Sequence, residues 1–135
     1  MSDRPKLICF DWDGTLIDSF DKIATAIYKT AANLGYKSVP KTRIKRKIGL
    51  SFGQLLSELY GKVQEEDFIE EYHYIYGKMP APALYPGCVK LLESLIAEGI
   101  QVAIVTNKSR LSPEAELDAH GISHLISSIW VAEEL

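Results

Sequence analysis

The stretch Lys6-Leu7-Ile8-Cys9-Phe10-Asp11-Trp12-Asp13-Gly14-Thr15 decides the fold class of this chain. Its first half is a short apolar run, and its second half is acidic and stops at a glycine. A run of this length with a glycine behind it favours a buried strand over a helix. The two carboxylates, Asp11 and Asp13, leave the carboxyl end of that strand together and can both face one pocket, whereas Trp12 between them is expected to point elsewhere.

The segment from residue 18 to residue 80 is helical in pattern almost throughout. Asp18-Ser19 offers an N-cap for a first helix. Ser51-Phe52-Gly53-Gln54 has the form of a capping box and opens a further helix. Another amphipathic helix is expected from Glu65 to Tyr76, closed by Gly77.

Strands and helices alternate in the rest of the chain. A helix is expected after Pro86-Gly87, and the β-branched run from Ile100 to Val105 predicts a strand that ends at Thr106-Asn107. Ser112-Pro113-Glu114 indicates a helix start, because proline suits the first helical position and an acid suits the positive end of the helix dipole. Leu125 to Val131 is the third strand candidate.

This order of elements predicts a parallel α/β fold with an all-helical domain inserted after the first strand. We expect the α/β core to consist of residues 1–17 and 81–135, and the helical insert to consist of residues 18–80.

The composition is typical of a soluble globular protein, with 135 residues, 47% of them hydrophobic and 24% charged. A net charge of -3 provides no global attraction to nucleic acid or to an anionic membrane. No apolar run approaches the roughly 20 residues that span a bilayer, and the N-terminus leads straight into a strand rather than a secretory signal. Cys9 and Cys88 form no C-x-x-C motif, so we expect two reduced thiols in a cytoplasmic protein.

Polar residues follow two strands at their carboxyl ends, where open parallel sheets bind their ligands. These residues are Asp11 and Asp13 after the first strand, and Thr106 and Asn107 after the second. Two carboxylates this close repel each other, so they need a cation or a shared proton. Mg²⁺ fits, because it prefers oxygen ligands and commonly takes one or two carboxylates plus a substrate phosphate. One carboxylate can then attack phosphorus, while the other protonates the leaving oxygen and later deprotonates a water.

Two segments resemble motifs of the haloacid dehalogenase superfamily. The run Phe10-Asp11-Trp12-Asp13-Gly14-Thr15-Leu16-Ile17-Asp18-Ser19 resembles its motif I, and Ile104-Val105-Thr106-Asn107-Lys108 resembles its motif II. The helical insert resembles the C1-type cap of that superfamily. Tyr85-Pro86-Gly87, together with Thr106-Asn107-Lys108, is most similar to the phosphoglycolate phosphatase branch. The implied fold is a three-layer, Rossmann-like core with strand order 3-2-1-4-5, of which this chain holds strands one to three.

The resemblance also implies a role for each motif residue. Asp11 is the expected nucleophile and Mg²⁺ ligand, and Asp13 is the expected acid/base and a second ligand through its backbone carbonyl. Thr106 is expected to bind the transferring phosphoryl group, with Asn107 and Lys108 beside it in the substrate site. The implied activity is Mg²⁺-dependent hydrolysis of small phosphorylated metabolites through an aspartyl-phosphate. Dehalogenase members lack the second acid, so Asp13 favours phosphoryl transfer over carbon–halogen cleavage.

Substrate choice in C1-capped relatives is set by a cap loop that aligns here with residues 48–52. Arg46 and Lys47 beside this loop are candidates to hold a carboxylate or phosphate of the substrate.

Two further motifs of the superfamily, a lysine and an acidic pair that completes the Mg²⁺ site, do not follow in this sequence. We therefore expect a truncated chain with impaired activity. The first strand would then be an exposed apolar edge that invites pairing with another chain, and the remaining core is small. We expect a protein that self-associates through this edge or is marginally stable. Two alternative functions stay open: a phosphomutase of a sugar phosphate, and a catalytically inactive fragment that acts by binding or assembly.

Overall fold

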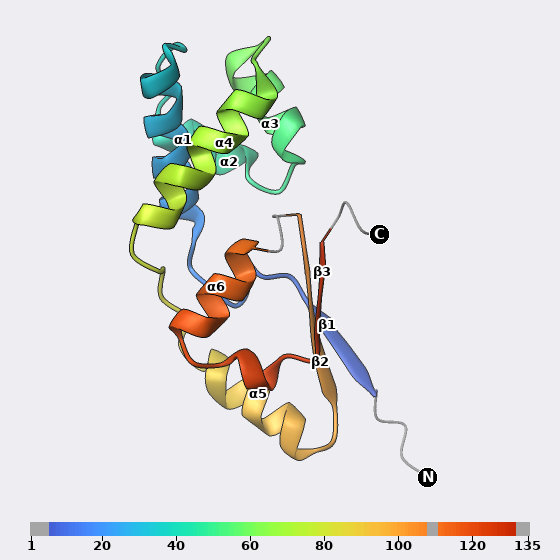
Figure 1. Ribbon diagram of the computed structural model, residues 1–135. Helices are drawn as coiled ribbons and strands as arrows, with labels where there is room; N and C mark the ends of the chain where they lie inside the picture. Colours follow the sequence, from blue (N-terminus) through green and yellow to red (C-terminus); the bar gives the residue numbers. More distant parts are fainter. Residues whose placement is uncertain (1–5, 108–110, 132–135) are drawn as a thin grey trace. The chain divides into compact units, whose positions relative to one another are not determined.

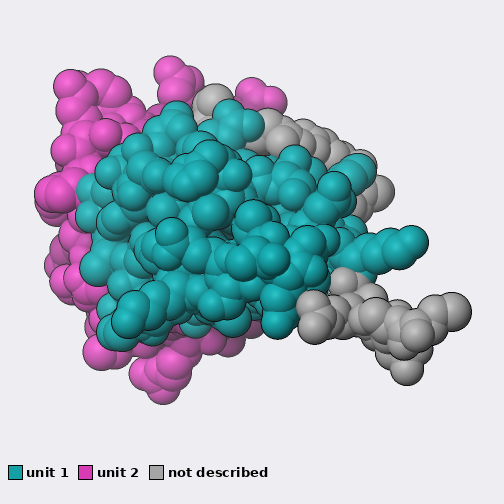
Figure 2. All heavy atoms as spheres, turned by 90° about the horizontal axis from the view of Figure 1, so that it is seen from below, with its two compact units in different colours: residues 1–18, 81–135 teal, residues 19–80 magenta. Residues whose placement is uncertain are grey.

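The computed structural model describes residues 6–107 and 111–131. The chain divides into two compact units, shown in different colours in Figure 2. Unit 1 comprises Met1–Asp18 and Ala81–Leu135, and unit 2 comprises Ser19–Pro80.

Unit 1 is built on a parallel sheet with the strand order β1-β2-β3. Its elements in chain order are β1 (Leu7–Phe10), α5 (Cys88–Ala97), β2 (Gln101–Thr106), α6 (Leu111–Ala119), the 3-10 turn η1 (Ser123–Leu125) and β3 (Ser128–Val131). β2 pairs with β1 from Gln101 to Ile104 and with β3 from Ala103 to Thr106. The predicted parallel α/β core is confirmed.

Both helices of unit 1 lie on the same face of this sheet (Figure 1). The strand order explains this arrangement, because two right-handed crossovers that step in the same direction place their helices on one side. On the helix-covered face, Val102 is fully buried in a core that includes Leu92 of α5 and Leu117 of α6. On the opposite face, Leu7 and Trp130 are each 47% exposed.

β1 is not the buried strand that its apolar sequence predicts. Leu7 and Cys9 are exposed, while Ile8 and Phe10 are half-buried. The reason is topological: within the described residues β1 pairs only with β2. Leu7 and Cys9 alternate with Ile8, whose partner Val102 packs into the core beneath the helices, so Leu7 and Cys9 lie on the other face of the sheet. Within the described residues, β1 is therefore an exposed apolar edge strand, as the second expectation had it, and not a buried strand.

Unit 2 is all-helical and has a core of its own. It contains α1 (Phe20–Leu34), α2 (Lys41–Lys47), α3 (Phe52–Tyr60) and α4 (Glu65–Lys78). Phe68 is fully buried, and its ring centroid lies 5.9, 6.1 and 5.8 Å from those of Tyr36, Phe52 and Tyr60. At the start of α3 the Ser51 hydroxyl accepts the N–H of Gln54 at 3.3 Å, as the capping-box pattern predicts.

Three element boundaries differ from the sequence prediction. α4 continues through Gly77, whose φ is not in the left-handed region that ends a helix. α6 begins at Leu111, before Ser112; Pro113 remains in the first turn, where its missing N–H costs no hydrogen bond. β3 begins at Ser128 rather than Leu125, because Leu125 ends the turn η1 and Ile126 is its C-cap.

Candidate active site

The chain reverses in a tight turn directly after β1. The carbonyl oxygen of Trp12 accepts the N–H groups of Leu16 and Ile17 at 3.0 and 3.2 Å, and the N–H of Gly14 donates to the carbonyl oxygen of Ile17 at 2.9 Å. Gly14 has a φ of 78°, a left-handed conformation that glycine adopts without steric cost. The backbone hydrogen bonds therefore fix residues 12–17 as one unit, which we call the β1 turn.

Exposure alternates along the start of this turn. Asp11 is exposed, Trp12 is fully buried and Asp13 is half-buried. The Oδ1 atom of Asp11 accepts the backbone N–H of Trp12 at 2.9 Å. Trp12 thus points into the core of unit 1, as expected, and the Asp11 carboxylate stays accessible to a ligand from solvent.

The end of β2 lies at the same edge of the sheet as the β1 turn. Phe10, the last residue of β1, pairs in parallel with Ile104, two residues before the end of β2. Thr106 at that end is 4% exposed, and the following Asn107 is exposed. Lys108, the third residue predicted for substrate binding, lies outside the described residues. The sheet therefore brings the two sequence motifs to one edge through Thr106 and Asn107.

The segment after the β1 turn runs beside residues 83–85. The N–H of Asp18 donates to the carbonyl oxygen of Ala83 at 2.8 Å, and the N–H of Tyr85 donates to the carbonyl oxygen of Leu16 at 3.0 Å. These hydrogen bonds join the β1 turn to the segment that leads into α5.

Asp18 does not cap α1 as the sequence predicts. Its Oδ1 atom accepts the hydroxyl hydrogen of Tyr85 at 3.3 Å, and burial, the negative charge of Asp18 and this hydrogen bond raise the pKa of the Tyr85 hydroxyl. Ser19 occupies the N-cap position, but its side chain forms no capping hydrogen bond. The Asp18 side chain thus binds Tyr85 in the segment before α5 and does not cap α1.

Arg46 and Lys47, the candidate substrate-binding cations, lie at the end of α2 in unit 2. The Lys47 ammonium group pairs with the Glu58 carboxylate at 3.1 Å. The Nε–H of Arg46 donates to the carbonyl oxygen of Thr42 at 3.4 Å. Binding of a substrate anion by Lys47 would therefore compete with Glu58.

Sequence reasoning missed Glu116 of α6. This side chain is 3% exposed, and its Oε1 atom accepts the indole Nε1–H of Trp12 at 2.9 Å. The available signal was weak: an acidic residue directly before Leu117 and three positions after Pro113, both of which are buried. Contact with a residue 104 positions away cannot be inferred from that pattern.

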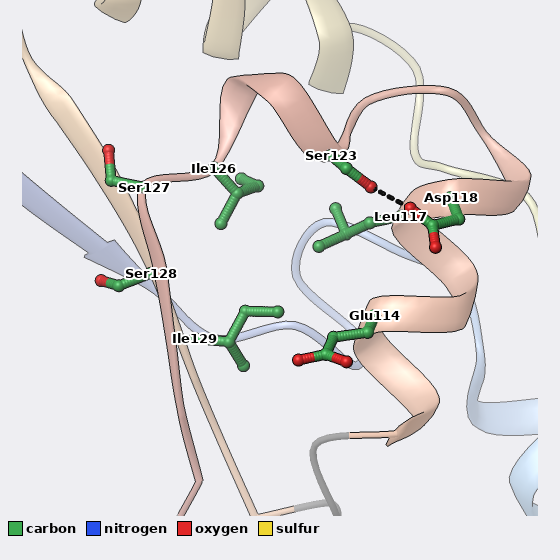
Figure 3. A pocket seen from close by; sticks show the side chains of 8 residues that line it. All are labelled: Glu114, Leu117, Asp118, Ser123, Ile126, Ser127, Ser128 and Ile129. Atoms are coloured by element: carbon green, nitrogen blue, oxygen red, sulfur yellow. Dashed lines mark hydrogen bonds between the residues drawn. The ribbon is translucent and has the colours of Figure 1, made fainter.

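An open hollow of about 390 Å³ lies beside α6 and β3 (Figure 3). Glu114 and Ile129 point toward one another across it, and the Ser123 hydroxyl donates to Oδ1 of Asp118 at 2.5 Å. Its lining consists of Glu114, Leu117, Asp118, Ser123, Ile126, Ser127, Ser128 and Ile129. Two carboxylates and no cation in this lining make it unfavourable for a phosphate. No predicted site residue lines it.

Within residues 6–107 and 111–131, no group of three or more His, Cys, Asp or Glu side chains is placed to hold a metal ion. Mg²⁺ does not require such a group, because it keeps several waters and takes one or two protein carboxylates plus substrate phosphate. Asp11 and Asp13 provide that smaller donor set, so the residues fit Mg²⁺. The described part of the chain also contains no helix that is long and apolar enough to cross a membrane.

Comparison with known proteins relates nearly the whole chain to one family. The family model described as haloacid dehalogenase-like hydrolase matches residues 8–135. Phosphoglycolate phosphatase of Rhodospirillum rubrum is 28% identical over 93% of this chain and 57% of its own length. Phosphoglycolate phosphatase of Haemophilus influenzae strain 86-028NP is 30% identical over the full chain and 66% of its own length.

The fold of the chain is also similar to that of a solved structure. The crystal structure of a predicted phosphoglycolate phosphatase from Haemophilus somnus 129pt superimposes with a TM-score of 0.83 at 28% identity. That match covers 97% of this chain and 64% of the other. The chain thus spans less than two thirds of the length of the relatives it matches here.

Proposed function

The chain belongs to the haloacid dehalogenase-like hydrolase family, and we propose that it carries the nucleophile and the acid/base of a Mg²⁺-dependent phosphatase of small phosphorylated metabolites. The observation that carries this proposal is the β1 turn, which leaves Asp11 exposed and Asp13 half-buried at the edge of the sheet where β2 ends in Thr106. The phosphoglycolate phosphatases among the relatives support a small phosphate monoester as the substrate class.

In the proposed reaction Asp11 and Asp13 have separate roles. A carboxylate oxygen of Asp11 attacks phosphorus, and the bond from phosphorus to the ester oxygen breaks as the aspartyl-phosphate forms. Asp13 donates its proton to the departing ester oxygen, so the product leaves as an alcohol. Asp13 then takes a proton from a water, whose oxygen attacks phosphorus and releases inorganic phosphate from Asp11.

Mg²⁺ would be held by the Asp11 carboxylate and the backbone carbonyl of Asp13, and it supplies positive charge that offsets the charges of the phosphate and of the carboxylates. The hydroxyl of Thr106 and the N–H of Asn107 would bind the phosphoryl oxygens, and Lys108 follows them in sequence.

Unit 2 fits the role of a cap that selects the substrate. It is inserted between β1 and α5, it is all-helical and it has its own buried core. We assign it as a C1-type cap, with residues 48–52 as the element that distinguishes substrates. Arg46 is a better candidate than Lys47 to bind an anionic group of the substrate, because Lys47 is paired with Glu58.

The test is phosphate release by this chain from 2-phosphoglycolate and from an aryl phosphate, with Mg²⁺ and with excess chelator. Asp11→Asn should lower the rate by at least about 10³-fold, because it removes the nucleophile. Asp13→Asn should lower it by about 10²- to 10⁴-fold, the usual contribution of an acid/base. Asp118→Asn, the same chemical change on α6, is the matched control and should retain the wild-type rate. Phosphate release that does not depend on Mg²⁺, or that survives in Asp11→Asn, would contradict the proposal, and so would the absence of release by the wild-type chain.

A further inference from the structure

Glu116 is a buried carboxylate that the proposed reaction does not use. It is 3% exposed on α6, yet its neighbour Leu117 shows that this side of the helix packs into an apolar core. Burial of an ionised carboxylate is unfavourable unless hydrogen bonds satisfy its oxygens. The Trp12 indole supplies one of them, at 2.9 Å between Nε1 and Oε1.

Trp12 also provides most of the backbone hydrogen bonds that form the β1 turn. Its carbonyl oxygen accepts the N–H groups of Thr15, Leu16 and Ile17, and its own N–H donates to the carboxylate of Asp11. A displacement of Trp12 would therefore move the hydrogen-bond acceptor of the turn and the donor that orients Asp11 at the same time.

The hydrogen bond joins the first motif of the proposed site to the helix that follows the second motif. Trp12 lies between Asp11 and Asp13 in the first motif, and α6 is the helix that follows Thr106 and Asn107 of the second. The indole fills a fully buried position in the same core as Leu117, so packing and the hydrogen bond to Glu116 together hold the ring. The hydrogen bond to Glu116 satisfies the indole N–H at this buried position.

We propose that Glu116 is a positioning residue, which holds the indole of Trp12 and thereby keeps the β1 turn in the conformation that presents Asp11 and Asp13 to a phosphate. This inference rests on the proposed function for its catalytic consequence. Its structural part, the tether between α6 and the β1 turn, stands on the hydrogen bonds above.

The test compares variants that keep or remove each partner of this hydrogen bond. Glu116→Gln keeps a carbonyl acceptor for the indole, Glu116→Leu removes it, and Trp12→Phe removes the donor while keeping a ring. Leu117→Ala is the control for general loosening of α6, because it removes a buried apolar contact but leaves the tether. The first measurement is the hydrogen exchange of the backbone amides of residues 14–17 in the absence of substrate.

A hydrogen bond to a charged group shifts an equilibrium by about ten- to a hundredfold. We expect Glu116→Leu and Trp12→Phe to speed exchange of these amides by at least about tenfold relative to exchange elsewhere in unit 1. Glu116→Gln should restore most of the protection, and Leu117→Ala should speed exchange across α6 without singling out the β1 turn. In the Trp12→Phe background, Glu116→Leu should have little further effect, since the tether is already lost.

The second measurement is the rate with the aryl phosphate and Mg²⁺. Glu116→Leu should lower kcat by about tenfold or more with little change in KM, and Glu116→Gln should recover it. The inference is overturned if exchange of residues 14–17 in Glu116→Leu matches wild type, or if Glu116→Leu acts equally in the presence and absence of the Trp12 indole. Failure of the proposed function has a different signature, because a wild-type chain without Mg²⁺-dependent turnover would still show the exchange pattern of the tether.

Discussion

The hydroxyl of Tyr60 provides a sharp stability prediction. Tyr60 is 7% exposed in the core of unit 2, and its hydroxyl oxygen is a buried polar atom without a hydrogen-bond partner among the described residues. Tyr36 belongs to the same aromatic cluster, at 6.2 Å between ring centroids, but its hydroxyl accepts the N–H of Gln64 at 2.9 Å. The two tyrosines thus offer a matched pair of hydroxyl deletions.

Tyr60→Phe should stabilise the protein and Tyr36→Phe should destabilise it. A buried hydroxyl without a partner loses its hydration on folding at a cost of about 1–3 kcal/mol, whereas a typical formed hydrogen bond contributes about 0.5–1.5 kcal/mol. We therefore expect a change of about +1 kcal/mol in the free energy of unfolding for Tyr60→Phe and about -1 kcal/mol for Tyr36→Phe. With a urea slope of about 2 kcal/mol/M, the two midpoints should move by about 0.5 M in opposite directions.

The assay is urea unfolding followed by far-ultraviolet circular dichroism, which reports the helices of both units. A lower midpoint for Tyr60→Phe than for wild type would refute the reasoning, because it would mean that the hydroxyl is satisfied in the native state.

The same residue predicts a dependence on pH. Burial, followed by the charge of Tyr28, raises the pKa of Tyr60 from 10.0 to about 12. Because the pKa of Tyr60 is higher in the folded state, a rise in pH above 10 ionises this side chain first in the unfolded state. The free energy of unfolding of the wild type is therefore unaffected by this ionisation below pH 10 and falls as the pH rises toward 12. The advantage of Tyr60→Phe over wild type should therefore grow between pH 10 and 12, and an advantage that is constant over this interval would contradict the assigned shift.

Three smaller predictions concern the surface, the helix ends and the open edge. Asp21→Asn should lower the free energy of unfolding by only a few tenths of a kcal/mol at pH 7 and low salt, because the ion pair of Asp21 with Lys45 at 2.9 Å is exposed. Lys45 lowers the pKa of Asp21 below 3.8. The stability difference between the variant and the wild type should therefore be complete above pH 3.8 and vanish as the pH falls through the lowered pKa. Gly77→Ala should raise the free energy of unfolding by up to about 1 kcal/mol, since a Cβ at this helical position meets nothing within 4 Å, whereas Gly35→Ala should lower it by a similar amount, since Gly35 has a φ of 81°. Leu7→Lys should weaken any self-association seen by sedimentation velocity, because a charge on an exposed edge strand opposes strand pairing; a wild-type chain that is monodisperse, monomeric and cooperatively melting would refute the expected association through β1.

The fold could be predicted from the sequence because its signals are local and agree with one another. The apolar run before Asp11, the capping box at Ser51 and the β-branched residues of β2 each specify one element without reference to the rest of the chain. Errors occur where a local signal is weak or is overridden. Gly77 is typical of a helix end but lies inside α4 without a left-handed φ, and Leu125 ends a 3-10 turn instead of opening a strand.

The candidate site could be predicted only in part, for a related reason. Asp11 and Asp13 are two residues apart in sequence, and the rule for parallel sheets places the end of β2 beside them. The hydrogen bond between Trp12 and Glu116 depends on packing between residues 104 positions apart, and only the folded chain shows it. The capping role expected of Asp18 fails for the same reason, since its partner Tyr85 lies far along the chain.

The most direct test of the central claim is to trap the phosphorylated enzyme. The chain is mixed with ³²P-labelled substrate and Mg²⁺ and stopped in acid. One half is digested in acid and mapped for the label, and the other half is reduced with borohydride, which releases the phosphate and converts the acyl phosphate to the corresponding alcohol, before peptide mapping. We predict that the label and the reduced side chain both map to Asp11 and that Asp11→Asn accumulates no labelled species. With the aryl phosphate, whose leaving group needs little protonation, Asp13→Asn should accumulate more of the labelled species, because it mainly slows the attack of water. Turnover without a labelled intermediate, or a label at any residue other than Asp11, would contradict the account.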